Sequence, residues 1–158
     1  MNVVFLSLGS NLGNRTKMLK LAIHRLSTFS VVEKISTFIE TKPQGVKEKQ
    51  PKYINAVVKI TTPLSSSALL DHLMQLEKDL GRDLLEKGLK KSRSIDIDIL
   101  SFNDEVIETK MLTIPHPLLH KRDFVLVPLA EIDPEWVHPI LKKSSQELLD
   151  KIMKLSKE

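Results

Sequence analysis

The sequence predicts a single α+β domain in which helices cover an antiparallel sheet. Short apolar or alternating segments rich in β-branched residues, typical of strands, are interspersed with amphipathic segments of helical periodicity. The chain has 158 residues, which is long enough for one hydrophobic core. No internal repeat, low-complexity segment or linker divides the sequence, so we expect one domain over residues 1–158.

The first half of the chain is expected to form a strand, a helix and two further strands. Residues 3–8 are apolar and β-branched, as in a buried strand, and apolar residues then recur at helical spacing to about Thr28. Residues 31–39 predict a second strand, and residues 53–61, which alternate cleanly, predict a third. The polar segment between them, residues 41–52, is long for a compact domain, so it is a candidate lid or binding loop.

The second half predicts a helix, a strand and a C-terminal extension. Leucines at positions 69, 73, 76 and 80 share one face of a helix that a serine can cap and that Gly81 is expected to end. The later elements expected are a strand at 93–100, a turn with a short hairpin return at 102–107, an extended piece at 112–115, a buried apolar segment at 124–129 and a helix capped by Ser144 or Ser145. The order β-α-β-β-α-β is that of the ferredoxin-like, split β-α-β arrangement. We therefore expect three layers, α-β-α.

Composition excludes several kinds of protein. Without cysteine, the chain has no disulfides, thiolate nucleophiles or cysteine-ligated zinc. It has no apolar run of membrane-spanning length and no signal-peptide pattern, so we expect a cytoplasmic protein, without a membrane partner. The formal charge of +4 is modest, but residues 81–93 hold five basic residues against two acidic ones. A solvated surface loop would account for this segment, as would an anionic ligand such as a nucleotide; the segment is too small to predict a nucleic-acid surface.

The strand at residues 93–100 carries the clearest indication of chemistry. Its isoleucines share one face, and Asp96 and Asp98 share the other. Residues i and i+2 on a strand lie about 7 Å apart, so the two carboxylates repel each other. A divalent cation, or a pair of them, would compensate this repulsion. The pattern alone leaves open an exposed strand face whose charges are balanced by nearby lysines.

Four other features are candidates for binding. The glycines in the turn at residues 9–14 could let the backbone approach a ligand closely, or the segment is a plain strand-to-helix turn. The spacing of its residues does not match that of a phosphate-binding P-loop. Tyr53 and Asn55 share a strand face that could recognise a flat heterocycle or be merely half-exposed. His116 is held between two prolines. Glu77, near the expected helix end, is unfavourable with the helix dipole, which favours a basic or ligand partner, although a solvated glutamate is the commoner case.

Several motifs in one order carry a resemblance to a known family. They are residues 8–13 (Leu-Gly-Ser-Asn-Leu-Gly), 40–43 (Glu-Thr-Lys-Pro), 53–56 (Tyr-Ile-Asn-Ala), 80–82 (Leu-Gly-Arg), 93–100 (Arg-Ser-Ile-Asp-Ile-Asp-Ile-Leu), 115–117 (Pro-His-Pro) and 122–129 (Arg-Asp-Phe-Val-Leu-Val-Pro-Leu). Each is modest alone, but together they are highly specific. Over nearly its whole length the chain resembles the 6-hydroxymethyl-7,8-dihydropterin pyrophosphokinases of folate biosynthesis.

The resemblance implies an activity and a set of catalytic residues. The family's enzymes transfer a pyrophosphoryl group from ATP to the hydroxymethyl group of the reduced pterin and release AMP. By match, Asp96 and Asp98 would bind two magnesium ions that bridge the ATP phosphates, and Arg82 and Arg93 would contact those phosphates. The further residues implied for ATP are Glu77, Ile99, His116 and Arg122.

The resemblance also implies a pterin site. Asn55 would bind the ring edge, and Tyr53 and Phe124 would contact the ring. The remaining residues implied are Thr41, Lys42 and Gln44, through their backbone, with Gly9 and Ser10 beneath the pocket. Residues 43–52 and 83–92 would close over the substrates.

This chain departs from the family's usual pattern in the second of those loops. Residues 88–92 (Gly-Leu-Lys-Lys-Ser) lack the usual aromatic residue, and Leu84 replaces a second arginine. We therefore expect weaker or differently ordered closure, even if Lys87, Lys90 or Lys91 takes over phosphate contacts, because lysine lacks the forked guanidinium of arginine.

Two other kinds of function are compatible with parts of the sequence. A ferredoxin-like module that binds a small molecule without catalysis would not need the paired aspartates and arginines. An RNA-binding sheet would need aromatic residues at the centres of its strands, and the aromatic residues of this sequence do not follow that pattern. A different magnesium-dependent phosphoryl transferase should lack the Asn55 and Phe124 pair. The expected partners are thus ATP and the pterin, bound by a monomer.

Overall fold

The structure is a computed structural model that describes residues 1–41, 52–86 and 95–156, with only the backbone of residues 82–86. Its centre is a five-stranded sheet in which every pairing is antiparallel. Four strands lie in the order β2 (Val31–Ile35), β4 (Tyr53–Thr62), β1 (Asn2–Ser10) and β5 (Asp96–Phe102), and β3 (Ile39–Thr41) also pairs with β4. The predicted α+β fold with an antiparallel sheet is confirmed.

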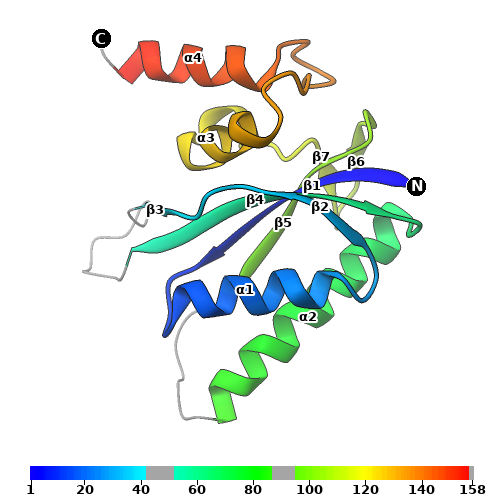
Figure 1. The fold of residues 1–158 in the computed structure, drawn as a ribbon. Helices are drawn as coiled ribbons and strands as arrows, with labels where there is room; N and C mark the ends of the chain where they lie inside the picture. Colours follow the sequence, from blue (N-terminus) through cyan, green and yellow to red (C-terminus); the bar gives the residue numbers. More distant parts are fainter. Residues whose placement is uncertain (42–51, 87–94, 157–158) are drawn as a thin grey trace.

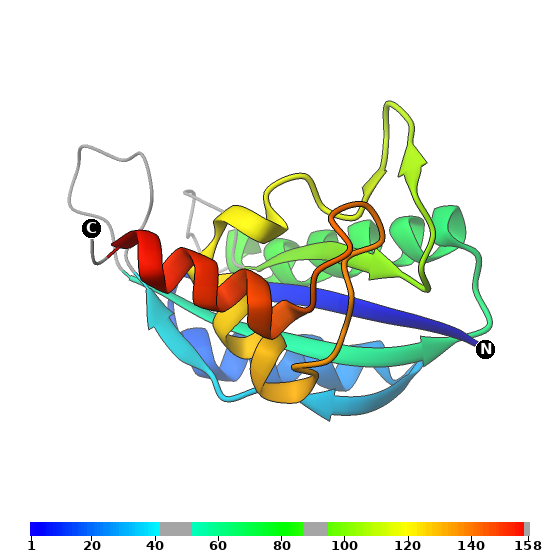
Figure 2. The same cartoon turned by 90° about the horizontal axis from the view of Figure 1, so that it is seen from above.

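Helices cover both faces of this sheet, as Figures 1 and 2 show. Helices α1 (Arg15–Leu26) and α2 (Ser66–Glu86) lie on one face, and α3 (Asp123–Ile132) and α4 (Ser145–Ser156) lie on the other. Strand alternation explains the arrangement, because successive side chains point to opposite faces. The leucines and isoleucines predicted to face the core, among them Leu6, Ile54 and Ile97, pack with α1 and α2.

A second, smaller core lies between the sheet and the C-terminal helices. On the sheet it contains Phe5, Val57 and Leu100, which belong to the face opposite the first core. Leu126 and Leu129 of α3 and Leu148 of α4 are buried against it. The central strands are therefore buried on both faces along part of their length.

The strand predicted at residues 31–39 is interrupted in the structure, and this corrects the prediction. Ser36 donates its backbone N–H to the carbonyl of Val57, and its hydroxyl accepts the Val57 N–H. The register then shifts by one residue before β3 begins at Ile39, opposite Asn55. The β-branched composition is compatible with one strand, but a serine side chain that bonds to the neighbouring backbone competes with the regular ladder.

Helix α2 runs past Gly81 to Glu86, so the predicted end at this glycine is wrong. Glycine ends a helix where the backbone turns left-handed, and among the described glycines only Gly13 has a positive φ. A helical glycine merely weakens the helix, by about 1 kcal/mol relative to alanine. Glu77 consequently lies well inside α2, and the dipole argument made for it does not apply.

The C-terminal extension differs from the prediction in its pairing. The sequence predicts that the segment after β5 turns back and forms a hairpin with that strand. Instead, β6 (Ile107–Glu108) pairs with β7 (Thr113–Ile114) in a separate two-stranded hairpin. A 3-10 turn, η1 (Leu119–Lys121), leads into α3, which includes the predicted apolar segment. Ser144 caps α4: its hydroxyl accepts the Glu147 N–H, and the Glu147 carboxylate accepts the Ser144 N–H.

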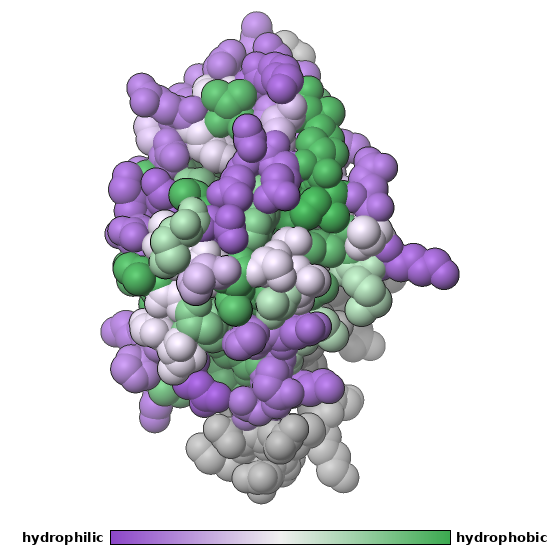
Figure 3. All heavy atoms as spheres, turned by 90° about the vertical axis from the view of Figure 1, so that its right-hand side faces the viewer, coloured by the Kyte–Doolittle hydropathy of each residue, from purple (hydrophilic) through white to green (hydrophobic). Residues whose placement is uncertain are grey.

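The face on the side of β6, β7 and the N-terminus mixes polar and apolar side chains (Figure 3). Exposed large apolar residues are Val106 and Met111 in and just before the hairpin, and Val137, Ile140 and Leu141 in the α3–α4 connection. Within the described part of the chain, no helix is long and apolar enough to cross a membrane.

Candidate active site

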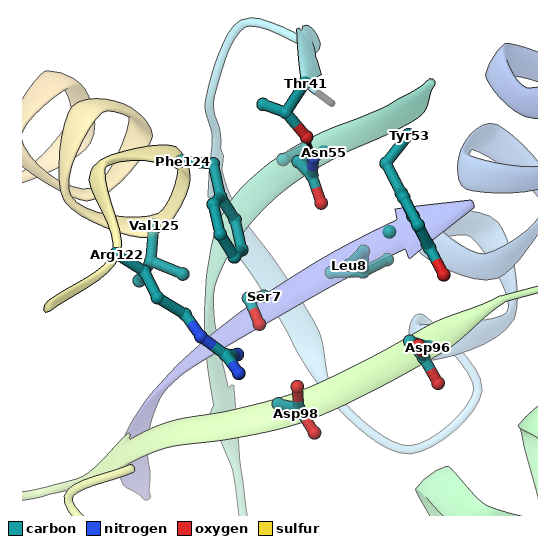
Figure 4. Close-up of a pocket in the computed structure, with 12 residues that line it drawn as sticks. Ser7, Leu8, Thr41, Tyr53, Asn55, Asp96, Asp98, Arg122, Phe124 and Val125 are labelled. Atoms are coloured by element: carbon teal, nitrogen blue, oxygen red, sulfur yellow. Dashed lines mark hydrogen bonds between the residues drawn. The ribbon is translucent and has the colours of Figure 1, made fainter. Parts of the chain in front are cut away.

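A pocket opens on the sheet face that carries α3, beside the N-terminal end of that helix (Figure 4). Its volume is about 160 Å³. Strands β1, β3, β4 and β5 supply its floor and one side, and α3 with the residue before it supplies the other. The lining residues are Ser7, Leu8, Gly9, Thr41, Tyr53, Asn55, Ala56, Asp96, Asp98, Arg122, Phe124 and Val125.

The register of the sheet brings the polar lining residues together. Gly9 on the central strand β1 pairs with Asn55 on one side and with Asp96 on the other. A Cβ atom at Gly9 would lie 2.8 Å from Asn55 Oδ1 and 3.6 Å from Tyr53 Cδ1. Glycine is therefore required here for close approach, because any side chain would push the Asn55 amide out of its position.

The Asn55 amide is oriented by a hydroxyl from the neighbouring strand. Its Nδ2 donates a hydrogen bond of 2.5 Å to Thr41 Oγ1. With the amide nitrogen so engaged, Asn55 Oδ1 is on the Gly9 side. Figure 4 shows Phe124 and Tyr53 flanking this amide. Two aromatic side chains around one oriented amide are suited to a flat ligand with hydrogen-bonding groups on its edge.

Two carboxylates form the other side of the pocket. Asp96 and Asp98 point from one face of β5 into it, and both are half-buried. The described residues contain no group of three or more histidine, cysteine or acidic side chains that could hold a metal ion without help. Mg²⁺ is usually bound by one or two carboxylates, with water and substrate phosphate oxygens completing its octahedron. The pair therefore fits magnesium that is shared with a phosphate ligand.

His116 faces the second of these carboxylates, with its Nε2 4.0 Å from Asp98 Oδ2. Burial lowers the pKa of His116, the Asp98 carboxylate opposes this shift, and Arg122 lowers the pKa further. The imidazole is thus neutral at pH 7. Its Nδ1 accepts the Leu118 N–H at 3.2 Å, so the proton is assigned to Nε2, toward Asp98.

Arg122 and Phe124 reach the pocket together from the start of α3. The Arg122 guanidinium lies over the Phe124 ring, with 5.5 Å between Cζ and the ring centroid. Stacking on an aromatic face restricts the long arginine side chain. Figure 4 shows Arg122 extending toward the β5 side of the pocket, which places a fixed positive charge near the carboxylates.

The structure brings most of the predicted site residues together. The predicted residues that line the pocket are Gly9, Thr41, Tyr53, Asn55, Asp96, Asp98, Arg122 and Phe124. Ser10 and Ile99 instead have buried side chains and do not line it, and Glu77 is half-buried on α2. Lys42, Gln44, Arg93 and the side chain of Arg82 lie outside the described residues.

Sequence reasoning missed four lining residues: Ser7, Leu8, Ala56 and Val125. Ser7 could have been found, because it precedes Gly9 by two positions on an alternating strand and so shares its face. Val125 could not, because its approach to the sheet depends on how α3 packs.

Comparison with known proteins identifies the family. The model of the 7,8-dihydro-6-hydroxymethylpterin-pyrophosphokinase family matches residues 5–134. The chain belongs to this family. A 2-amino-4-hydroxy-6-hydroxymethyldihydropteridine pyrophosphokinase from Aquifex aeolicus is 46% identical over 147 residues, which are 93% of this chain and 90% of that protein. The enzyme of the same description from Haemophilus influenzae is 40% identical over 141 residues, or 88% and 86% of the two chains.

Some of the similar proteins are larger. The folic acid synthesis protein of Pneumocystis carinii is 41% identical over 95% of this chain, which spans only 20% of that protein. A crystal structure of Plasmodium falciparum HPPK-DHPS aligns with 99% of this chain and 46% of its own, with a TM-score of 0.84 and 18% identity. That structure supports the fold.

Proposed function

We propose that this pocket binds the reduced pterin next to ATP, so that the pterin hydroxymethyl group meets the ATP phosphates at the β5 carboxylates. The family's reaction is pyrophosphoryl transfer from ATP to 6-hydroxymethyl-7,8-dihydropterin in folate biosynthesis. The observation that carries the proposal is that one pocket combines an oriented amide between aromatic rings with a pair of carboxylates.

The amide side suits the pterin. The ring would lie beside Phe124 and Tyr53, and the Asn55 amide would bond to its edge. One of the two N–H groups on Asn55 Nδ2 donates to Thr41, and Oδ1, on the Gly9 side, would accept from a donor on the ring edge. The backbone groups of Thr41, Lys42 and Gln44 are assigned to hydrogen bonds with the remaining polar groups of the ring. Gly9 and Ser10 are assigned to the strand that lies beneath the bound ring.

The carboxylate side suits ATP. Asp96 and Asp98 would hold magnesium, and the ion supplies charge neutralisation and polarisation of the phosphate that is attacked. His116 lies beside the second carboxylate, with its Nε2 4.0 Å from Asp98 Oδ2, and is assigned with Arg122 to ATP. Arg122 donates to phosphate oxygens. Arg82 and Arg93 are assigned to the phosphates, and Glu77 with the backbone at Ile99 to the nucleotide.

The rest of catalysis is positioning, because phosphoryl transfer needs two reactants aligned more than it needs a strong base. The ferredoxin-like assignment of the fold belongs to the same proposal and is supported by the strand order β2-β4-β1-β5. We also propose that the protein acts as a monomer in the cytoplasm.

AMP release from Mg²⁺-ATP, measured with and without 6-hydroxymethyl-7,8-dihydropterin, tests the proposal. We expect pterin-dependent AMP formation that stops when EDTA removes the metal. Binding of both substrates without AMP formation would instead support a binding module without catalysis. AMP formation that ignores the pterin would indicate a different transferase.

A further inference from the structure

Helix α3 forms one wall of the pocket, and an acidic side chain in its last turn is hydrogen-bonded to the segment between β2 and β3. Glu131, in the last turn of α3, accepts three hydrogen bonds from Thr37. The Thr37 N–H donates to Oε1 at 2.9 Å and to Oε2 at 3.2 Å, and the Thr37 hydroxyl donates to Oε2 at 2.7 Å. The two residues are 94 positions apart in the chain.

The position of this glutamate is unfavourable for the helix itself. The C-terminal end of a helix carries partial negative charge, so a carboxylate in the last turn is destabilising, and α3 has no basic residue there. Charge-assisted hydrogen bonds to an ionised carboxylate are about twice as strong as neutral ones. The contact with Thr37 therefore offsets an intrinsic disadvantage, which indicates that the carboxylate serves the docking of the helix rather than its formation.

The anchor on the sheet side is itself hydrogen-bonded to a neighbouring strand. Thr37 follows Ser36, whose backbone and hydroxyl both bond to Val57 on β4. A second bond joins the same parts of the molecule, because Lys34 Nζ donates to the Ile132 carbonyl at the end of α3 at 3.1 Å. The break between β2 and β3 is thus the place where the sheet holds α3.

The opposite end of α3 reaches the pocket. Phe124 lies seven residues before Glu131, about 10 Å along a helix. Pro128 lacks the N–H that would bond to the Phe124 carbonyl, which weakens the internal bonding of the first turn. The placement of Phe124 therefore depends more than usual on how the whole helix is docked.

We propose that Glu131 is a positioning residue for the pterin site: its bonds to Thr37 set the docking of α3 on the sheet, and thereby the placement of Phe124 against Asn55. Glu131 itself touches no substrate. This inference rests on the proposed function, in which the pocket takes the pterin. It adds a residue at the far end of α3 that the pocket lining does not include.

Direct pterin binding to Glu131→Ala tests the proposal. We expect the Kd for the pterin to rise about tenfold, because Phe124 on α3 would no longer be held in a fixed position relative to Asn55 on β4. Glu131→Gln, which keeps a carbonyl acceptor, should recover most of the affinity. The matched control is Glu135→Ala, which removes an exposed glutamate just beyond α3 and should leave the Kd unchanged.

A double-mutant cycle with Phe124→Ala separates positioning from general stability. If Glu131 acts through Phe124, then Glu131→Ala should weaken pterin binding less than about twofold further once Phe124 is truncated. An equal loss in both backgrounds, or an unchanged Kd in folded Glu131→Ala, would overturn the proposal. Circular dichroism and urea titration establish that each variant is folded.

Hydrogen exchange without ligand keeps this inference separable from the proposed function. Glu131→Ala should speed amide exchange in the first turn of α3, near Phe124, and leave α1 unchanged. If the wild-type chain failed to bind the pterin, the proposed function would fall. If amide exchange in α3 were the same in Glu131→Ala as in the wild type, the docking role of Glu131 would be overturned, whether or not the wild-type chain binds the pterin.

Discussion

Asp98 and Leu100 lie two residues apart on the same face of β5, yet one lines the pocket and the other is 1% exposed beneath the C-terminal helices. The neighbouring strands repeat the contrast. Ser7 lines the pocket and Phe5 is buried on β1, and Asn55 lines it and Val57 is buried on β4. One face of one sheet is thus divided into a polar half, left open for ligands, and an apolar half that α3 and α4 cover.

The difference shows what positions a site on a sheet. The apolar half supplies the burial that fixes α3, and the start of α3 then overhangs the polar half with Arg122 and Phe124. Substitutions in the two halves should therefore have separable effects, one on activity and the other on stability.

The largest effect is expected for Asp98→Ala in the polar half. Loss of one of the two carboxylates should lower the rate of pterin-dependent AMP release at least about a hundredfold, because a metal ligand is removed. The unfolding free energy should change little, since the Asp98 side chain is 48% exposed. A near-wild-type rate at saturating Mg²⁺ would refute the role of Asp98. Asp98→Asn keeps the shape and isolates the charge.

Leu100→Ala is the matched substitution in the apolar half of the same strand face. Deleting a fully buried leucine typically costs about 2–5 kcal/mol of stability through lost burial and the cavity left behind. Urea unfolding measures this loss, and the folded fraction should keep its kcat. A drop in kcat as large as that of Asp98→Ala would mean that the two halves are not separable.

A smaller effect is expected where the central strand passes beneath the amide. Gly9→Ala adds a Cβ only 2.8 Å from Asn55 Oδ1, which should disturb the bond between Asn55 and Thr41. We expect pterin affinity, measured by titration calorimetry, to fall about tenfold with the fold retained. Gly13→Ala is the contrasting control: nothing lies within 4 Å, but its φ of +64° is strained for alanine. It should lower stability by about 1 kcal/mol and leave the affinity unchanged, and the reverse pattern would contradict the argument.

The smallest effect is expected for the pH dependence of protein stability. It arises from a histidine in the connection between α3 and α4, the two helices that cover the apolar half. His138 is buried, and its Nδ1 accepts the backbone N–H groups of Ile140 and Leu141. Burial, and to a lesser degree His120, lowers the pKa of His138 below its ordinary value of 6.5. The unfolded chain therefore binds the proton first, so stability is complete above pH 6.5 and decreases as the pH falls toward the folded-state pKa.

Thermal unfolding between pH 5 and pH 7 measures this dependence. His138→Asn keeps an acceptor that does not titrate and should flatten the profile. The pKa values of His116 and His120 are also lowered, in each case chiefly by burial. A weaker slope should therefore persist after His138 is replaced, and it should decrease again when His120 is replaced as well. An unchanged slope in the double variant would exclude both histidines as its cause.

The sequence by itself determined most of the strands and helices and most of the pocket. Period-two alternation placed Asp96 and Asp98 on one face and Ile97 and Ile99 on the other, because strand geometry is local. The motifs around Gly9, Asn55 and Phe124 selected pocket residues without knowledge of their distances. Local signals failed where they competed: Ser36 broke a strand of favourable composition, and α2 continued through Gly81.

Only the tertiary structure decided which part of the sheet face stays open. Asp98 and Leu100 point to the same side of the sheet, although Leu100 lies where the pairing with β1 shifts its register. Their different surroundings come from α3, which lies more than twenty residues later and covers Leu100. That helix is fastened by contacts such as the one from Thr37 to Glu131, which no local pattern indicates. Periodicity depends on neighbours in the chain and can be read from them, whereas the docking of a helix depends on side chains that meet only once the chain has folded.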